Sequence, residues 1–148
     1  MKKKLYVIDF DNTLVNTAET IRNFGSQYNL VQLEPYYKMV DLVRRRLRRG
    51  NSVLVLSARH PRYKSYLQEF ISELLGRDIE IILVRIHMLK WFYVNRWATQ
   101  YHSVVVIDDM LRKEETGSPK KLFYPTLGMK NITYIAHDKV INLRNSKN

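Results

Sequence analysis

Short apolar runs alternate with longer amphipathic segments along this chain. Runs rich in Val, Ile and Leu occupy residues 5–8, 52–56, 79–84, 104–107 and 132–136. Continuous runs of this length predict strands that are buried on both faces of a sheet. Between the runs, apolar residues recur every three or four positions, which predicts helices over residues 17–24, 35–50, 63–75 and 88–101.

This order of strands and helices predicts the α/β fold class. Strands that alternate with helices favour a parallel sheet, here of about five strands, with helices on both faces. The 148 residues fit one domain, residues 1–148, with a core of its own. We expect residues 112–125 to form a polar loop and residues 144–148 to fray at the end of the chain.

Two acids follow the first apolar run. Asp9 and Asp11 lie two residues apart, and such side chains point the same way on an extended backbone. Their carboxylates are therefore expected to face one small volume at the carboxyl end of the strand, where α/β sheets bind ligands. A divalent cation would relieve the repulsion between them, and oxygen ligands favour Mg²⁺. Alternatively, both aspartates are turn residues that close a strand.

Polar residues also follow the second apolar run. Ser57, Ala58 and Arg59 come directly after residues 52–56. A hydroxyl and free backbone N–H groups at the carboxyl end of a strand can hold phosphate oxygens. The sequence therefore predicts a substrate-binding turn at residues 57–59, although Ser57 could equally be an ordinary turn residue.

A second pair of acids follows the fourth apolar run. Asp108 and Asp109 come directly after residues 104–107. Their carboxylates can complete a Mg²⁺ shell that begins with Asp9 and the backbone of Asp11. Eighteen residues earlier, Lys90 lies near the start of the predicted helix 88–101. A lysine in this position, taken alone, indicates only a solvated side chain.

Taken together, these stretches resemble the haloacid dehalogenase (HAD) superfamily. The stretch LYVIDFDNTL at residues 5–14 resembles its first motif, DxDxT, in which the first Asp is a phosphoryl-accepting nucleophile and the second a general acid/base. Ser57 matches the second motif, Lys90 the third, and the acids at 108–109 the fourth. The resemblance covers residues 5–136 and implies a Rossmann-like phosphatase domain with a minimal cap or none.

The resemblance implies a role for each of these side chains. Asp9 attacks phosphorus and forms an aspartyl-phosphate, while Asp11 protonates the leaving oxygen and then activates water. Ser57 and Lys90 hold the phosphoryl oxygens, with Mg²⁺ bound to the acids. Asp109 orients a metal-bound water or Lys90.

Within the superfamily, the chain is most similar to the phosphatase half of phage polynucleotide kinase/phosphatase. Three features carry this resemblance: Ser-x-Arg at 57–59, a Lys that precedes an aromatic-rich helix, and Ile-Asp-Asp at 107–109. No Gly-rich phosphate loop with its Lys occurs, so no kinase half is expected. The substrate that the resemblance implies is the terminal phosphate of a polynucleotide, with a 3′-phosphate favoured.

The charge balance also favours a nucleic acid or nucleotide partner. Lys and Arg total 25 against 14 Asp and Glu, a formal net charge of +11, and such an excess attracts polyanions. Only 38 residues lie between Leu14 and Val53, and the linking helix takes most of them, so little remains for a lid. Five arginines in the stretch Arg44–Arg49 fit either a solvated face or a phosphate-binding patch.

Two other functions stay open. A phosphatase for nucleoside monophosphates or other small phosphate esters would use residues 15–33 as a short lid over one base. A nucleic-acid-binding module could keep the scaffold without turnover. The chain has no Cys, and the acids interrupt the first apolar run too early for a secretory signal, so we expect a cytoplasmic protein.

Overall fold

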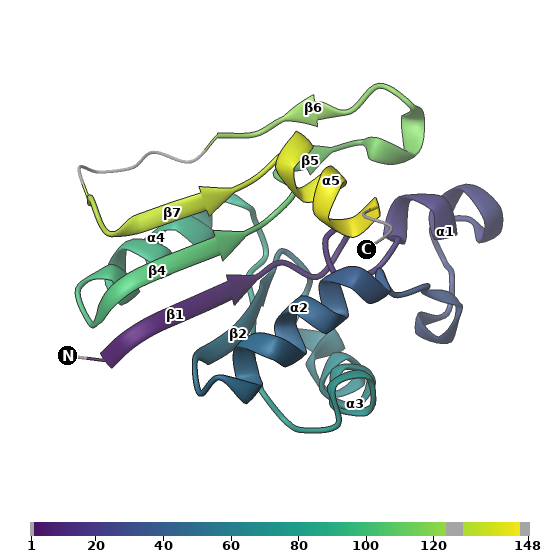
Figure 1. Ribbon diagram of the computed structural model, residues 1–148. Coiled ribbons are helices and arrows are strands. Elements are labelled where there is room, and N and C mark those ends of the chain that lie inside the picture. Colours follow the sequence, from purple (N-terminus) through teal and green to yellow (C-terminus); the bar gives the residue numbers. More distant parts are fainter. Residues whose placement is uncertain (1, 124–128, 146–148) are drawn as a thin grey trace.

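A five-stranded parallel sheet forms the centre of the molecule, in the order β3-β2-β1-β4-β7 (Figure 1). The computed structural model describes residues 2–123 and 129–145. The strands are β1 (Lys2–Ile8), β2 (Ser52–Ser57), β3 (Glu80–Leu83), β4 (Tyr101–Ile107) and β7 (Ile132–Ile135). All five coincide with the predicted apolar runs, so the predicted parallel α/β sheet is confirmed.

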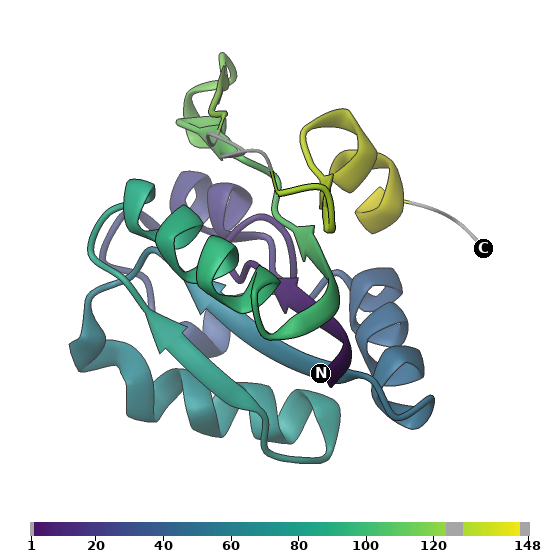
Figure 2. The same ribbon diagram turned by 90° about the vertical axis from the view of Figure 1, so that its left-hand side faces the viewer.

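Helices cover both faces of the sheet, which makes the fold Rossmann-like (Figures 1 and 2). Helices α2, α3 and α5 pack on one face and α4 on the other. Helix α1 lies beyond the carboxyl end of β1. The helices are α1 (Thr17–Phe24), α2 (Tyr37–Arg48), α3 (Lys64–Leu75), α4 (Met88–Ala98) and α5 (Asp138–Asn145). The part of the chain that is described contains no helix long and apolar enough to cross a membrane.

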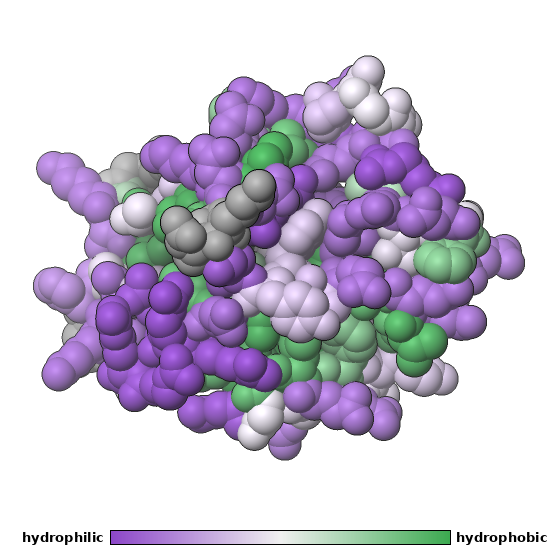
Figure 3. Space-filling model, turned by 45° about the vertical axis from the view of Figure 1, so that its right-hand side comes forward, coloured by the Kyte–Doolittle hydropathy of each residue, from purple (hydrophilic) through white to green (hydrophobic). Residues whose placement is uncertain are grey.

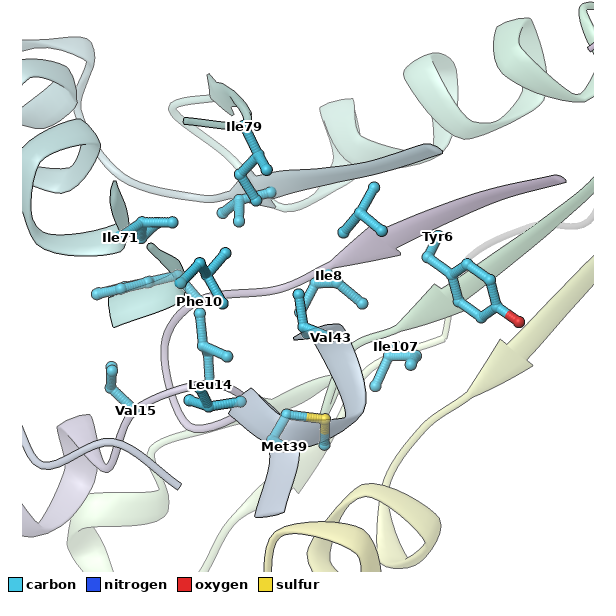
Figure 4. Packing of buried hydrophobic residues seen from close by; sticks show 14 of the residues in the cluster. Tyr6, Ile8, Phe10, Leu14, Val15, Met39, Val43, Ile71, Ile79 and Ile107 are labelled. Atoms are coloured by element: carbon cyan, nitrogen blue, oxygen red, sulfur yellow. The ribbon is translucent and has the colours of Figure 1, made fainter. Parts of the chain in front are cut away.

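Strand β1 supplies side chains to two separate core clusters. Leu5 and Val7 pack in the cluster that lies under α4, whereas Tyr6 and Ile8 pack in the cluster under α2 and α3 (Figure 4). Successive residues of a strand point to opposite faces, so a strand buried on both sides must be continuously apolar. This explains why the first apolar run has no polar alternation.

Two helices are several residues shorter than predicted. The helix expected over 35–50 begins at Tyr37, because Pro35 pairs with Val15 in an isolated bridge. It ends at Arg48, just before Gly50 takes a φ of 83° that ends a helix without strain. The helix expected over 88–101 ends at Ala98, and Tyr101 already belongs to β4.

The C-terminal third contains structure that the sequence pattern did not predict. The expected loop 112–125 contains a short antiparallel hairpin, β5 (Leu111–Arg112) and β6 (Lys120–Lys121), with a 3-10 turn at Glu114–Thr116; Pro125 lies outside the described residues. The expected frayed tail is also wrong in part. Arg144 belongs to α5 and forms an ion pair with Glu114 at 3.1 Å.

The strand register brings particular residues together at the carboxyl edge of the sheet. Ile8 pairs with Val55 on one side and with Ile107 on the other. The Asp9 N–H continues the ladder by donating to the Ile107 carbonyl at 2.9 Å. The acids that follow β1 and β4 therefore start from neighbouring positions.

Candidate active site

Lys90 lies between two buried carboxylates at this edge. Asp9 has the same parity as Leu5 and Val7, so it faces the α4 side of the sheet. Lys90, in the first turn of α4, donates to Asp9 Oδ1 at 2.9 Å and to Asp108 Oδ2 at 2.9 Å. All three side chains are at most 5% exposed. The lysine that would be solvated on an ordinary helix is here the shared cation of a buried ion-pair group.

Thr13 joins Asp9 to the fourth acid of the predicted set. Its hydroxyl lies 3.1 Å from Asp9 Oδ2 and 3.2 Å from Asp109 Oδ1, and it accepts from the Asp109 N–H at 3.0 Å. Thr13 is fully buried. The structure therefore brings Asp9, Lys90, Asp108 and Asp109 into one group, which we call the lysine cluster, with Thr13 as its bridge.

Burial is the largest influence on the pKa values in the lysine cluster, and the neighbouring charges act beside it. Burial, and then the charge of Asp108, raise the pKa of Asp9 to about 7 against the opposing charge of Lys90. Burial and the charges of Asp9 and Asp108 raise the pKa of Asp109 to about 12. Burial also disfavours ionisation of Asp108, but Lys90 and the Met110 N–H outweigh it and lower the pKa of that carboxyl.

Three carboxylates of the lysine cluster are close enough together to hold one cation. One carboxylate oxygen from each of Asp9, Asp108 and Asp109 lies within 4.8 Å of the other two. Asp109 Oδ2 is buried and accepts no hydrogen bond from a described residue. Three carboxylates and one ammonium leave room for two further positive charges, and an all-oxygen donor set suits a hard cation such as Mg²⁺. Protons on Asp9 and Asp109 would relieve the same excess.

Asp11 belongs to a second group at the same edge. Arg59 donates from Nε to Asp11 Oδ2 at 2.9 Å and from a terminal nitrogen to Asp11 Oδ1 at 2.6 Å. The Thr17 hydroxyl donates to Asp11 Oδ1 at 2.7 Å, and the Ser57 hydroxyl lies 3.5 Å from Oδ2. The two carboxylates that were expected to share one volume therefore have separate partners.

Aromatic rings surround the guanidinium of Arg59. It lies 5.4 Å from the ring centre of Phe10, 5.8 Å from Tyr28 and 5.7 Å from Tyr63, and it also donates to the Tyr28 hydroxyl. Burial would lower the pKa of Arg59, but its bonds to Asp11 and the Asp11 charge raise it overall. Arg59 is therefore a fixed cation whose two-pronged donor geometry orients Asp11.

A tight loop after β1 explains why the two aspartates diverge. The Leu14 N–H donates to the Phe10 carbonyl at 2.9 Å, so the chain turns immediately after Phe10. Asn12 has a φ of 60°, a conformation that Asn tolerates better than most residues, and its Oδ1 accepts from the Ala18 N–H at 2.7 Å. The loop therefore takes Asp11 out of the strand and places it beside Arg59.

The remaining predicted residues have different positions. Ala58 lines a cavity beside the site, between the loops after β2 and β3. The arginines of Arg44–Arg49 lie at the end of α2, which leads directly into the first residue of β2 and so lies at the amino edge of the sheet, opposite the site. Hydrophilic side chains cover most of the face drawn in Figure 3, in keeping with the net charge of +11.

Three residues of the site were missed or underrated by sequence reasoning. Thr13 is part of the DxDxT string, and this was the signal for its importance. Thr17 and Tyr28 carry no local signal, because their partners Asp11 and Arg59 are brought to them only by the fold.

Comparisons of the chain with models of protein families, with curated proteins and with solved structures find no match. The HAD resemblance therefore rests on the motifs in the sequence, and the chemistry has to be inferred from the geometry of the two groups.

Proposed function

We propose that this chain is a Mg²⁺-dependent phosphomonoesterase of the HAD type that acts through an aspartyl-phosphate. One observation carries the proposal: Lys90 joins Asp9 to Asp108 by two 2.9 Å hydrogen bonds at the carboxyl edge of the sheet, beside Asp11. Phosphoryl transfer depends mainly on positioning and on stabilising charge, and buried groups with fixed partners supply both.

In the first step the two aspartates have different tasks. A carboxylate oxygen of Asp9 bonds to phosphorus while the ester P–O bond breaks, and Asp11 gives its proton to the leaving oxygen. In the second step Asp11 takes a proton from water, the water oxygen bonds to phosphorus, and the bond to Asp9 breaks. Lys90 stabilises the phosphoryl oxygens, and Arg59 and Thr17 hold Asp11 in one orientation.

The proposed cation would be held by Asp9, Asp108 and the main-chain carbonyl of Asp11, with Asp109 as a further carboxylate next to them. When bound, it would neutralise the excess negative charge of the lysine cluster and stabilise charge on the phosphoryl oxygens. Ser57 is fully buried and lies next to Asp11, so its proposed contact with a phosphoryl oxygen needs the substrate to reach that depth.

The proposed substrate is a terminal phosphate of a polynucleotide, with a 3′-phosphate favoured. The net charge of +11 supports a polyanionic partner. A free nucleotide is the second candidate, and the segment between β1 and α2 favours it. That segment folds into α1 and a 3-10 turn at Leu30–Gln32, and its Tyr28 reaches Arg59.

The test is release of inorganic phosphate, with Mg²⁺, from a 3′-phosphorylated oligonucleotide, a 5′-phosphorylated one and a nucleoside monophosphate. We expect the 3′-phosphorylated oligonucleotide to react fastest. Asp9→Asn should abolish release, whereas Asp41→Asn, an exposed aspartate on α2, should leave it unchanged. Faster release from the monophosphate would favour the second candidate, and no release from any of them would overturn the proposal.

A further inference from the structure

A cavity of about 410 Å³ lies beside the lysine cluster and has no part in the proposed phosphoryl chemistry. Three loops line it: the turn after β2 with Ala58, the β3-α4 loop with Ile86 and His87, and the β5-β6 hairpin with Arg112 and Phe123. In Figures 1 and 2 the hairpin extends beyond the carboxyl end of β4. The volume falls within the range of roughly 300–1,000 Å³ that is usual for small-molecule sites.

Each of these loops is a close neighbour in the chain of a residue of the proposed active site. Ala58 lies between Ser57 and Arg59, and the His87 carbonyl accepts from the Lys90 N–H at 3.0 Å. The hairpin begins two residues after Asp109 and is tied back by a 2.7 Å hydrogen bond from the Leu122 N–H to the Met110 carbonyl. A ligand that fills the cavity is therefore a neighbour of a phosphate held by Lys90.

The lining combines exposed apolar side chains with arginines. Ile86 is 56% exposed, Met88 50% and Phe123 73%, so these side chains form an apolar surface that residues 2–123 and 129–145 leave uncovered. Arg85 and Arg112 also line the cavity, and Arg85 is held by the His60 ring at 3.1 Å. Burial, and then the positive charge of Lys90, lower the pKa of His87, so this ring is a neutral part of the wall.

Planar heterocycles attached to a phosphate match this combination. An aromatic ring such as Phe123 offers a face on which a base can stack, as aromatic side chains do in single-strand binding sites. Arginine stacks on bases as well and pairs with phosphate oxygens. The Phe123 ring already contacts the His137 ring, with centroids 4.9 Å apart at 61°, so its position is supported from one side.

We propose that this cavity receives the nucleobase of the nucleotide whose phosphate is removed. The inference rests on the proposed function, because it takes the lysine cluster as the phosphate end of the ligand. The nucleotide is either a free monophosphate or the last residue of a strand, and both present a base next to a phosphate.

The kinetic test uses three substrates with Mg²⁺: para-nitrophenyl phosphate, a 3′-phosphorylated oligonucleotide with a normal terminal base, and the same oligonucleotide with an abasic terminal residue. Phe123→Ala should raise the KM for the normal oligonucleotide about tenfold, as loss of one stacking contact does. It should leave kcat/KM for the other two substrates unchanged. Tyr66→Ala, which removes an aromatic ring that is 64% exposed on α3, is the matched control and should change nothing.

A binding test separates this inference from the proposed function. We expect the Asp9→Asn variant, which keeps the cavity, to bind the oligonucleotide with a terminal base about tenfold more tightly than the abasic one. Adding Phe123→Ala should remove that difference. If a nucleoside 3′-monophosphate binds as tightly as the oligonucleotide, the ligand of the cavity is a free nucleotide. If the monophosphate binds more weakly, the ligand is the last nucleotide of a strand.

Two results would overturn the inference. One is equal binding of the normal and abasic oligonucleotides. The other is that Phe123→Ala lowers kcat/KM equally for all three substrates. If wild-type protein hydrolyses none of the substrates but still binds the terminal base through Phe123, the proposed function fails while the base-binding cavity stands.

Discussion

Asp9 and Asp11 lie two residues apart in the chain, yet the fold gives them opposite surroundings. Asp9 is 5% exposed and shares Lys90 with Asp108, and burial among acids raises its pKa to about 7. The Asp11 side chain is 27% exposed and has a guanidinium of its own in Arg59. The difference arises because the strand ends at Ile8 and the chain turns after Phe10.

The end of one strand thus places two carboxylates in different surroundings, which suits the two roles proposed for them, nucleophile and general acid/base. A carboxylate in a group with excess negative charge is suited to a site that binds a cation and an electrophilic phosphorus. A carboxylate that a guanidinium holds in one orientation, and that water can reach, is positioned for the role proposed for Asp11. Changes that remove either cation should therefore have unequal effects.

The largest effect is expected for Lys90→Met. Loss of the shared ammonium leaves Asp9 and Asp108 buried without their cation, and removing one partner of a buried ion pair typically costs about 3–5 kcal/mol. Urea unfolding monitored by circular dichroism should show this loss of stability. Lys139→Met, at an exposed position on α5, is the control and should shift the unfolding free energy by less than about 0.5 kcal/mol.

A smaller effect of opposite sign is expected for Asp109→Asn in Mg²⁺-free buffer. The pKa of this acid is raised to about 12 in the folded protein, so folding at pH 7 requires it to take up a proton that the unfolded chain lacks. An amide avoids this cost, so the variant should be more stable than wild type at pH 7.

The pH dependence checks the sign of this prediction. Because the folded protein binds the extra proton, the contribution of Asp109 to stability falls as pH rises from about 4 towards 12. Urea unfolding at pH 6 and pH 8 should show a weaker fall in Asp109→Asn than in wild type. Added Mg²⁺ should stabilise wild type more than the variant, and equal stabilisation of the two would contradict a role for Asp109 at the cation site.

The smallest loss of stability is expected for Arg59→Lys. Asp11 keeps its hydrogen bond from Thr17 and its contact with water, so the unfolding free energy should fall by about 1 kcal/mol. Because lysine cannot form the two-pronged pair, phosphate release should fall by about tenfold or more. Arg62→Lys, an exposed arginine on the neighbouring 3-10 turn, is the control; a matching loss there would remove the assigned role of Arg59.

The sheet was predictable because its strands carry their own signal. Leu5 and Ile8 point to opposite faces of the sheet, and both are apolar because both faces are buried. An acid directly after such a run lies at the carboxyl edge of the sheet. Lys90 was found only through the family resemblance, because the pattern of a helix cannot show that one of its lysines is buried. The hairpin at 111–121 and helix α5 were missed because few of their residues enter the core.

The partner of Asp11 could not be predicted for a different reason. Arg59 lies 48 residues away, and the two meet only because β1 and β2 are neighbours in parallel register. The expectation that Asp9 and Asp11 share one volume assumed that the strand continued through residue 11. The strand ends at Ile8, and the loop that follows is closed by hydrogen bonds to the Phe10 carbonyl. The apolar pattern of the sequence does not show where this turn begins.

Covalent labelling tests the division of tasks between Asp9 and Asp11 most directly. An oligonucleotide with a ³²P-labelled 3′-phosphate is mixed with the protein and Mg²⁺, quenched with acid within a single turnover, and the protein is separated and treated with hydroxylamine, which cleaves acyl phosphates. We predict hydroxylamine-labile label on wild type and on Asp11→Asn, where it should persist longer, and none on Asp9→Asn. Label on Asp9→Asn, or turnover by wild type without any protein-bound label, would contradict the account.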